Sequence, residues 1–170
     1  RHLARLEPEG GELLLHIGRA AAAETCGVAM AVGSQRVQFS EAAEKTSFRL
    51  RDIAPDAVLI ANLGAVQLNY GFDSNHARRA VETLAADGLY LHLNPLQEAV
   101  QPEGDTNFAG LATKIAAVVR ALPVPVLLKE VGSGLSPADI TLGKQAGVRY
   151  YDLANGAVQT KKIQTDLIDC

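Results

Sequence analysis

A chain of 170 residues that is 48% hydrophobic and 21% charged has the length and composition of one globular domain. A net charge of −3 at pH 7 argues against a broad surface for nucleic acid or acidic membranes, although a small anion needs only a few donors. No apolar run approaches the roughly 20 residues that span a bilayer. The first residues lack the apolar core of a signal peptide, and two cysteines are too few for a disulfide framework. We therefore expect a cytoplasmic protein.

Strand and helix patterns alternate along the chain. Apolar runs predict strands, and recurrence of apolar residues every three or four positions predicts helices. Cys26 lies on an apolar helical face and is expected to be buried. Ser136 and Asp139 have the spacing of a capping box, which marks a helix start. The predicted elements in chain order are a helix over 13–26, a strand over 28–32, a helix over 41–50, a strand over 57–61, a helix over 74–86, a strand over 89–93, a helix over 107–122, a strand over 124–128, a helix over 136–147 and a strand over 148–153.

This alternation, at roughly 30 residues per unit, predicts an α/β fold with a parallel sheet. A doubly wound sheet would normally carry a glycine-rich fingerprint after its first strand, and neither that fingerprint nor a P-loop is present. Polar residues instead follow several strands, as they do at the mouth of a barrel. The predicted fold is therefore a (β/α)8 TIM barrel, a single domain over residues 1–170. It is incomplete in this chain, which has about five or six βα units.

The strand predicted at 89–93 ends in a cluster of polar side chains. Pro95 and Pro102 stiffen the loop that carries them. Polar groups just past a buried strand are the usual construction of an α/β active site, and the alternative is a polar loop with one satisfied histidine. The cluster consists of His92, Asn94, Gln97, Glu98 and Gln101.

Other strand ends carry further candidates, each with a plainer alternative. Lys129 ends an apolar strand and needs an anionic partner, which is a bound ligand or a neighbouring carboxylate. Arg36 can hold a phosphate through its guanidinium or lie on the rim. Asn62 can contact a planar heterocycle or cap a turn. Glu98 can hold Mg2+ through one oxygen or be a solvated loop residue.

Four segments in this order resemble the type 2 isopentenyl-diphosphate Δ-isomerases. They are MAVGSQR (30–36), ANLGAVQLNYG (61–71), LHLNPLQEAVQPEGD (91–105) and LPVPVLLKEVGSGLS (122–136). The resemblance implies a TIM barrel that binds FMN and Mg2+ and assembles as a tetramer or octamer. The implied reaction converts isopentenyl diphosphate to dimethylallyl diphosphate with reduced flavin, supplied through NADPH, and without net redox change.

The resemblance also implies roles for individual residues. Ser34, Asn62 and Lys129 look like FMN contacts, and Glu98 looks like the Mg2+ ligand. Gln97 and His92 are the predicted catalytic residues. The residues that resemble the substrate contacts are Ser34, Gln35, Arg36, His92, Asn94 and Gln97.

Two other functions remain open at this point. One is an FMN-dependent oxidoreductase of the 2-hydroxy-acid oxidase type, which shares the barrel and a strand-end lysine. Those enzymes use a histidine base late in the chain, whereas no histidine here follows His92. The other is a truncated barrel without catalytic activity.

Overall fold

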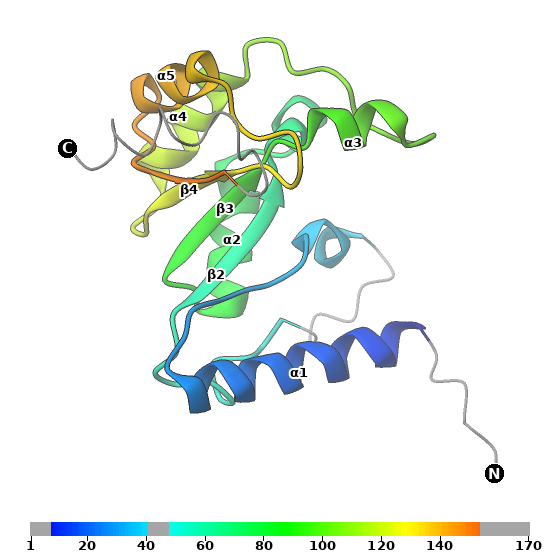
Figure 1. The fold of residues 1–170 in the computed structure, drawn as a ribbon, viewed down its shortest axis with the longest axis vertical. Helices are drawn as coiled ribbons and strands as arrows, with labels where there is room; N and C mark the ends of the chain where they lie inside the picture. The colour runs from blue at the N-terminus through cyan, green and yellow to red at the C-terminus, as the bar shows by residue number, and fades with distance from the viewer. Residues whose placement is uncertain (1–7, 41–47, 154–170) are drawn as a thin grey trace.

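The computed structural model describes residues 8–40 and 48–153 (Figure 1). No helix in these two ranges combines the length and apolarity that crossing a membrane requires. The helices and strands are α1 (Pro8–Cys26), β1 (Met30–Ala31), the 3-10 helix η1 (Gln35–Phe39), β2 (Leu59–Gly64), the 3-10 helix η2 (Ala65–Asn69), α2 (Ser74–Leu84), β3 (Gly88–His92), α3 (Pro95–Val100), α4 (Leu111–Ala121), β4 (Val126–Lys129), α5 (Pro137–Gln145) and β5 (Tyr150–Asp152).

The strands form one parallel sheet in which every strand lies beside its neighbour in sequence, in the order β1-β2-β3-β4-β5. The predicted (β/α)8 TIM barrel is therefore wrong for this structure. The described residues supply five strands to an open, curled sheet, with β1 and β5 at its edges. Closure around an axis takes eight strands and typically about 250 residues. The part of the prediction that holds is the α/β class with parallel strands.

Successive side chains of each strand point to opposite faces of the sheet, and only one face is fully buried. Leu59, Ala61, Leu63, Leu89 and Leu91 are at most 2% exposed and form the centre of the core. Helix α2 packs on β2 and β3, α4 packs on α2, and α5 packs on α4, so these helices cover that face. Figure 1 shows α1 at the lower end of the molecule and α3, α4 and α5 in its upper part.

The opposite face, which we call the open face, is only half-buried. In β2 to β4 it carries Asn62, Tyr90, His92, Leu127 and Lys129, which alternate with the buried leucines. Except for the buried Asn62, these side chains are of intermediate exposure. Polar side chains are therefore concentrated on the face that the helices do not cover.

Helix α5 begins as the sequence predicts. The Ser136 hydroxyl accepts a hydrogen bond from the Asp139 N–H at 3.2 Å, and the Asp139 carboxylate accepts one from the Ser136 N–H at 3.0 Å. Pro137 occupies the first turn, where a missing N–H costs nothing. This capping box is confirmed.

Several boundaries differ from the prediction. Residues 95–100, predicted as loop, form α3, and α4 begins at Leu111 because Gly110 precedes it in a left-handed conformation with φ of 65°. Cys26 is exposed rather than buried, because it ends α1. Of the helix predicted at 41–50, residues 41–47 lie outside the described residues, as do Asn155, Cys170 and the rest of 154–170.

Candidate active site

Four residues at the carboxyl ends of β2 to β5 lie in register across the open face. Gly64 pairs with His92, His92 with Lys129, and Lys129 with Asp152. We call these four the strand-end row. Because paired residues of a parallel sheet project on the same side, His92 and Lys129 share one face, as the sequence predicts for strand-end polar residues.

His92 is held by Asn62, which lies two residues before Gly64 on β2. The Asn62 Nδ2 donates to the Val32 carbonyl at 2.9 Å, and its Oδ1 lies 2.9 Å from His92 Nδ1. Burial, with the neighbouring charge of Lys129, lowers the pKa of His92 to about 4. The imidazole is therefore neutral near pH 7.

Lys129 lies between His92 and Asp152 and contacts an aromatic ring. Its ammonium is 5.5 Å from the centroid of the Tyr90 ring, within the range of a cation–π interaction. Burial raises the pKa of Tyr90, and the carboxylate of Asp152, to which the hydroxyl is hydrogen-bonded, raises it further. The result is a half-buried cation on an aromatic surface, which can receive the negative charge of a bound ring or anion.

Asn94, directly after β3, has a strained backbone and an unused acceptor. Its φ of 43° and ψ of 46° are left-handed, a conformation that few non-glycine residues adopt. The side chain is 7% exposed, and its Nδ2 donates to Gln97 Oε1 at 3.1 Å. Within the described residues, the buried Asn94 Oδ1 has no hydrogen-bond partner. Strain and an unpaired acceptor both point to a ligand-binding role.

Asp105 joins three segments beside α3. Its Oδ2 accepts hydrogen bonds from Arg36 Nη1 at 3.1 Å and from Gln67 Nε2 at 2.8 Å. Its own N–H donates to Glu98 Oε2 at 2.8 Å. Gln67 and Asp105 are not predictable as site residues from the sequence, although both lie in the matching segments, because a polar loop residue carries no signal of its partners.

The predicted residues of the first loop separate into two groups. Ser34 and Arg36 are exposed, and the Ser34 hydroxyl accepts a hydrogen bond from the Arg36 N–H. Gln35 is fully buried: its Nε2 donates to the Ala80 carbonyl and to Gln38 Oε1, and its Oε1 accepts from the Asn62 N–H. Direct contact between Gln35 and a ligand would require it to leave these partners.

Of the predicted FMN contacts on the open face, Lys129 is better placed to bind a flavin ring than Asn62 is. Such a ring needs a flat apolar surface with a cation that matches its reduced, anionic form; Tyr90, Leu127 and Lys129 supply both. Asn62 already uses its Oδ1 and one amide hydrogen, which leaves a single N–H for a cofactor.

A metal ion has one candidate ligand here. No group of three or more His, Cys, Asp or Glu side chains converges within residues 8–40 and 48–153. Mg2+ commonly takes one or two carboxylates and completes its shell with water and substrate phosphate. The half-buried Glu98 carboxylate, with one oxygen held by the Asp105 N–H, fits that arrangement.

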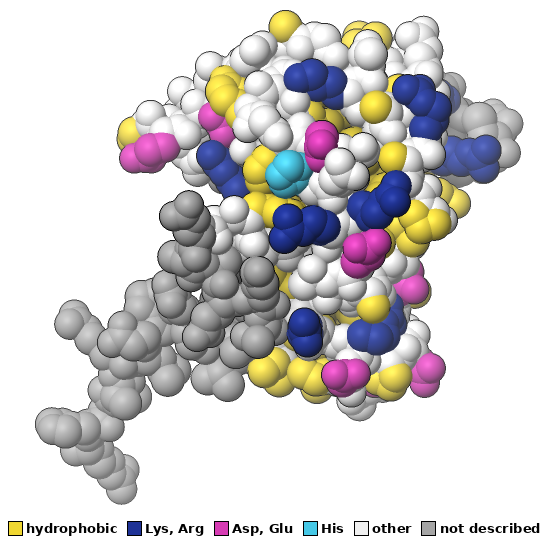
Figure 2. All heavy atoms as spheres, turned by 180° about the vertical axis from the view of Figure 1, so that it is seen from behind, with side chains coloured by type: hydrophobic (Ala, Val, Ile, Leu, Met, Phe, Trp, Pro, Cys, Tyr) yellow, Lys and Arg dark blue, Asp and Glu magenta, His cyan; other side chains and the backbone are white. Residues whose placement is uncertain are grey.

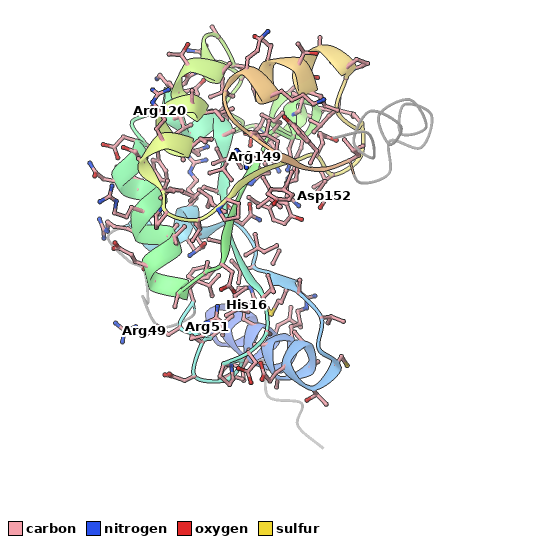
Figure 3. The ribbon with its side chains drawn as sticks, turned by 90° about the vertical axis from the view of Figure 1, so that its left-hand side faces the viewer. His16, Arg49, Arg51, Arg120, Arg149 and Asp152 are labelled. Carbon is pink, nitrogen blue, oxygen red and sulfur yellow. The ribbon has the colours of Figure 1, made fainter. Side chains whose placement is uncertain are left out.

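Two cavities are lined by none of the four residues of the strand-end row. One, of about 460 Å³, is largely apolar and opens between α4 and α5. The other, of about 310 Å³, is lined by Arg49, Arg51 and Arg79; Figure 3 shows Arg49 and Arg51 well separated from Asp152. Figure 2 shows basic, acidic and apolar side chains intermingled on the rear face.

Comparison with known proteins identifies relatives of this chain. It is 60% identical over 146 residues, 85% of its length, to the isopentenyl-diphosphate delta-isomerase of Paracoccus zeaxanthinifaciens. The chain is homologous to part of these isomerases. The Hydrogenovibrio crunogenus isomerase is 62% identical over 135 residues, and the Synechocystis isomerase is 46% identical over 147 residues. The chain spans only 42%, 39% and 42% of these three proteins, and no family model matches it.

Proposed function

We propose that this chain carries part of the active site of a type 2 isopentenyl-diphosphate Δ-isomerase. The observation that carries the proposal is the strand-end row, in which His92 and Lys129 lie side by side on the open face. The names of the relatives support the reaction, and the flavin-dependent type rests on the four quoted segments. The reaction adds a proton to the terminal alkene carbon and removes one from the carbon two positions away, so its balance needs no oxidant.

The diphosphate would bind near α3 in this proposal. Arg36 is 55% exposed and projects from η1, and Glu98 would hold Mg2+, which would supply positive charge for the diphosphate. The strained Asn94, directly after β3, and the exposed Ser34, directly before η1, would complete the anion site. Asp105 anchors both ends of this arrangement, because it binds Arg36 with its carboxylate and Glu98 with its N–H.

The hydrocarbon part of the substrate would lie over the open face. Bound FMN, when reduced, would supply the acid–base group of the allylic proton shift. Lys129 would stabilise negative charge there, since its ammonium lies against the Tyr90 ring in a half-buried position. Gln97 is exposed on α3, and its Oε1 is held by Asn94, so its amide N–H groups remain able to orient the substrate. NADPH as the source of electrons, a tetramer or octamer, and a cytoplasmic location belong to the same proposal.

The proposal is tested with the intact protein from which FMN has been removed. Isomerisation of isopentenyl diphosphate is expected only after FMN and a reductant are both restored. Glu98→Gln should raise the Mg2+ concentration required for half-maximal activity while FMN affinity stays within about twofold, since a hard cation prefers a carboxylate to an amide. Full activity without flavin would contradict the flavin-dependent type, and oxidation of a 2-hydroxy acid would favour the oxidase alternative.

A further inference from the structure

The orientation of the Asn62 amide is determined by a partner that can only accept a hydrogen bond. The Val32 carbonyl oxygen lies 2.9 Å from one end of the amide, so that end must be the nitrogen. A rotated amide would place two oxygens against each other. The end that faces His92 is therefore the oxygen, 2.9 Å from Nδ1.

An amide oxygen cannot donate, so the hydrogen between Asn62 and His92 belongs to His92 Nδ1. A neutral imidazole with its hydrogen on Nδ1 carries a lone pair on Nε2. This Nε2 lies beside Gly64, where a Cβ would come within 3.1 Å of it. Glycine at position 64 thus adds no side chain at the edge of the ring that bears the lone pair, where the Gln67 Cγ lies 3.2 Å from the same point.

The surroundings of His92 support the neutral form. Asn62 and Gly64 face it from β2, and Lys129 faces it from β4. Neither β2 residue carries a charge, and the ammonium opposes protonation of the ring. The low pKa of His92, about 4, follows from burial and from this lysine.

We propose that Asn62 is a positioning residue that holds His92 as the neutral Nδ1–H imidazole, so that Nε2 accepts a hydrogen bond from an O–H group of the ligand or of its metal-bound water. His92 then contacts the substrate as an acceptor, and the positive charge for the diphosphate comes from Arg36 and the metal. The inference deepens the proposed function and rests on it for the identity of the substrate. The state of the ring can be measured whether or not the protein isomerises anything.

The first test is nuclear magnetic resonance of intact protein labelled with 15N-histidine. His92 is assigned by the signal that disappears in His92→Gln, and His76 on α2 serves as the internal reference. At pH 7.5 we expect His92 with hydrogen on Nδ1 and none on Nε2. An Nε2–H tautomer or a doubly protonated ring in the unaltered protein would overturn the proposal.

The second test adds inorganic diphosphate, with and without Mg2+. A hydrogen-bond shift of Nε2 with diphosphate alone assigns the donor to the ligand, and a shift only with Mg2+ assigns it to the metal's water. Protonation of Nε2 on binding, or no change in either case, would contradict the acceptor role.

The third test is Asn62→Leu, which keeps the size of the side chain and removes the acceptor. The tautomer should move toward Nε2–H, and kcat should fall at least tenfold with KM changed less than threefold. An unchanged tautomer in this variant would show that Asn62 does not position the ring. If the parent protein lacks isomerase activity, the proposed function fails while the tautomer result stands.

Discussion

The Arg51 guanidinium and the Asp87 carboxylate lie 2.8 Å apart and connect the segment before β2 to the turn before β3. The same Asp87 oxygen accepts a hydrogen bond from the Leu59 N–H at 2.8 Å. Burial acts to raise the pKa of Asp87, but the Leu59 and Arg51 hydrogen bonds outweigh it, so the pKa lies below its ordinary value. Asp87 therefore fixes the starts of β2 and β3 relative to each other, because one of its oxygens binds both Arg51 and the Leu59 N–H.

Arg51→Lys should destabilise the fold by about 2 kcal/mol or more, because an ammonium cannot reproduce a planar fork with several acceptors. Besides Asp87, the guanidinium donates to the carbonyl oxygens of Ala54, Pro55, Ala57 and Ala85. Urea unfolding measures the change. Arg49→Lys, at an exposed position two residues earlier, is the control and should change stability by less than about 0.5 kcal/mol.

Gly104→Ala should damage the metal site, because a Cβ at position 104 would overlap the Glu98 carbonyl. The last turn of α3 must then move, and Glu98 and Asp105 move with it. We expect a lower thermal midpoint for unfolding. The Mg2+ concentration required for half-maximal activity should rise at least tenfold. Gly132→Ala is the matched control, since a Cβ there meets nothing within 4 Å. Equal behaviour of the two variants would show that this close approach does not matter.

Arg36→Gln should weaken binding of the diphosphate while it leaves the stability of the fold nearly unchanged. The Arg36–Asp105 ion pair is 55% exposed on the arginine side, so its loss should cost less than about 1 kcal/mol of stability. If Arg36 holds the diphosphate, the KM for isopentenyl diphosphate should rise at least tenfold. Arg120→Gln removes another exposed charge, on α4, and should leave KM unchanged. A KM that rises equally in both variants would indicate a general charge effect.

Acid should weaken the fold through His92 before it affects the carboxylates. The pKa of His92 is about 4 in the folded protein and ordinarily 6.5, so the unfolded chain binds the additional proton between these values. Stability that is present above pH 6.5 is therefore lost as pH falls toward 4, by no more than about 3 kcal/mol. Asp73 and Asp87, with lowered pKa values, lose their contributions only below their ordinary 3.8. Urea midpoints measured from pH 7.5 to 4.5 should fall less steeply in His92→Gln.

The elements that the sequence predicts correctly are those with a local cause. The capping box of Ser136 and Asp139 is complete within four residues, and the parallel strands follow from their apolar runs. Helix α3 was missed because its six residues include no buried side chain and so show no apolar stripe. The burial of Cys26 was predicted wrongly. Helical periodicity predicts on which face of a helix a residue lies, but it does not predict where along its length the helix stops packing against the core.

The site was predictable only in part, for a related reason. His92 and Lys129 could be placed at neighbouring strand ends because parallel strands share one carboxyl edge. The sequence predicts Gln35 as a polar loop residue. Its buried side chain instead forms hydrogen bonds with the backbone of Ala80, 45 positions away, and of Asn62, 27 positions away. Contacts over such separations depend on the packed structure, and the sequence shows neither partner. The closed barrel was predicted wrongly, although the five predicted strands are present, because a repeating unit does not determine whether the sheet closes.

The register that aligns Gly64, His92, Lys129 and Asp152 also limits how this chain can change. Because side chains alternate along a strand, the loss of one residue within β3 would turn His92 toward the helices and bring a leucine onto the open face. Insertions and deletions are therefore tolerable only in the connections between strands and helices. Single replacements are different, since each of the four strands contributes one position to the row. New chemistry at this edge can be acquired one residue at a time, without altering the buried face that holds the sheet together.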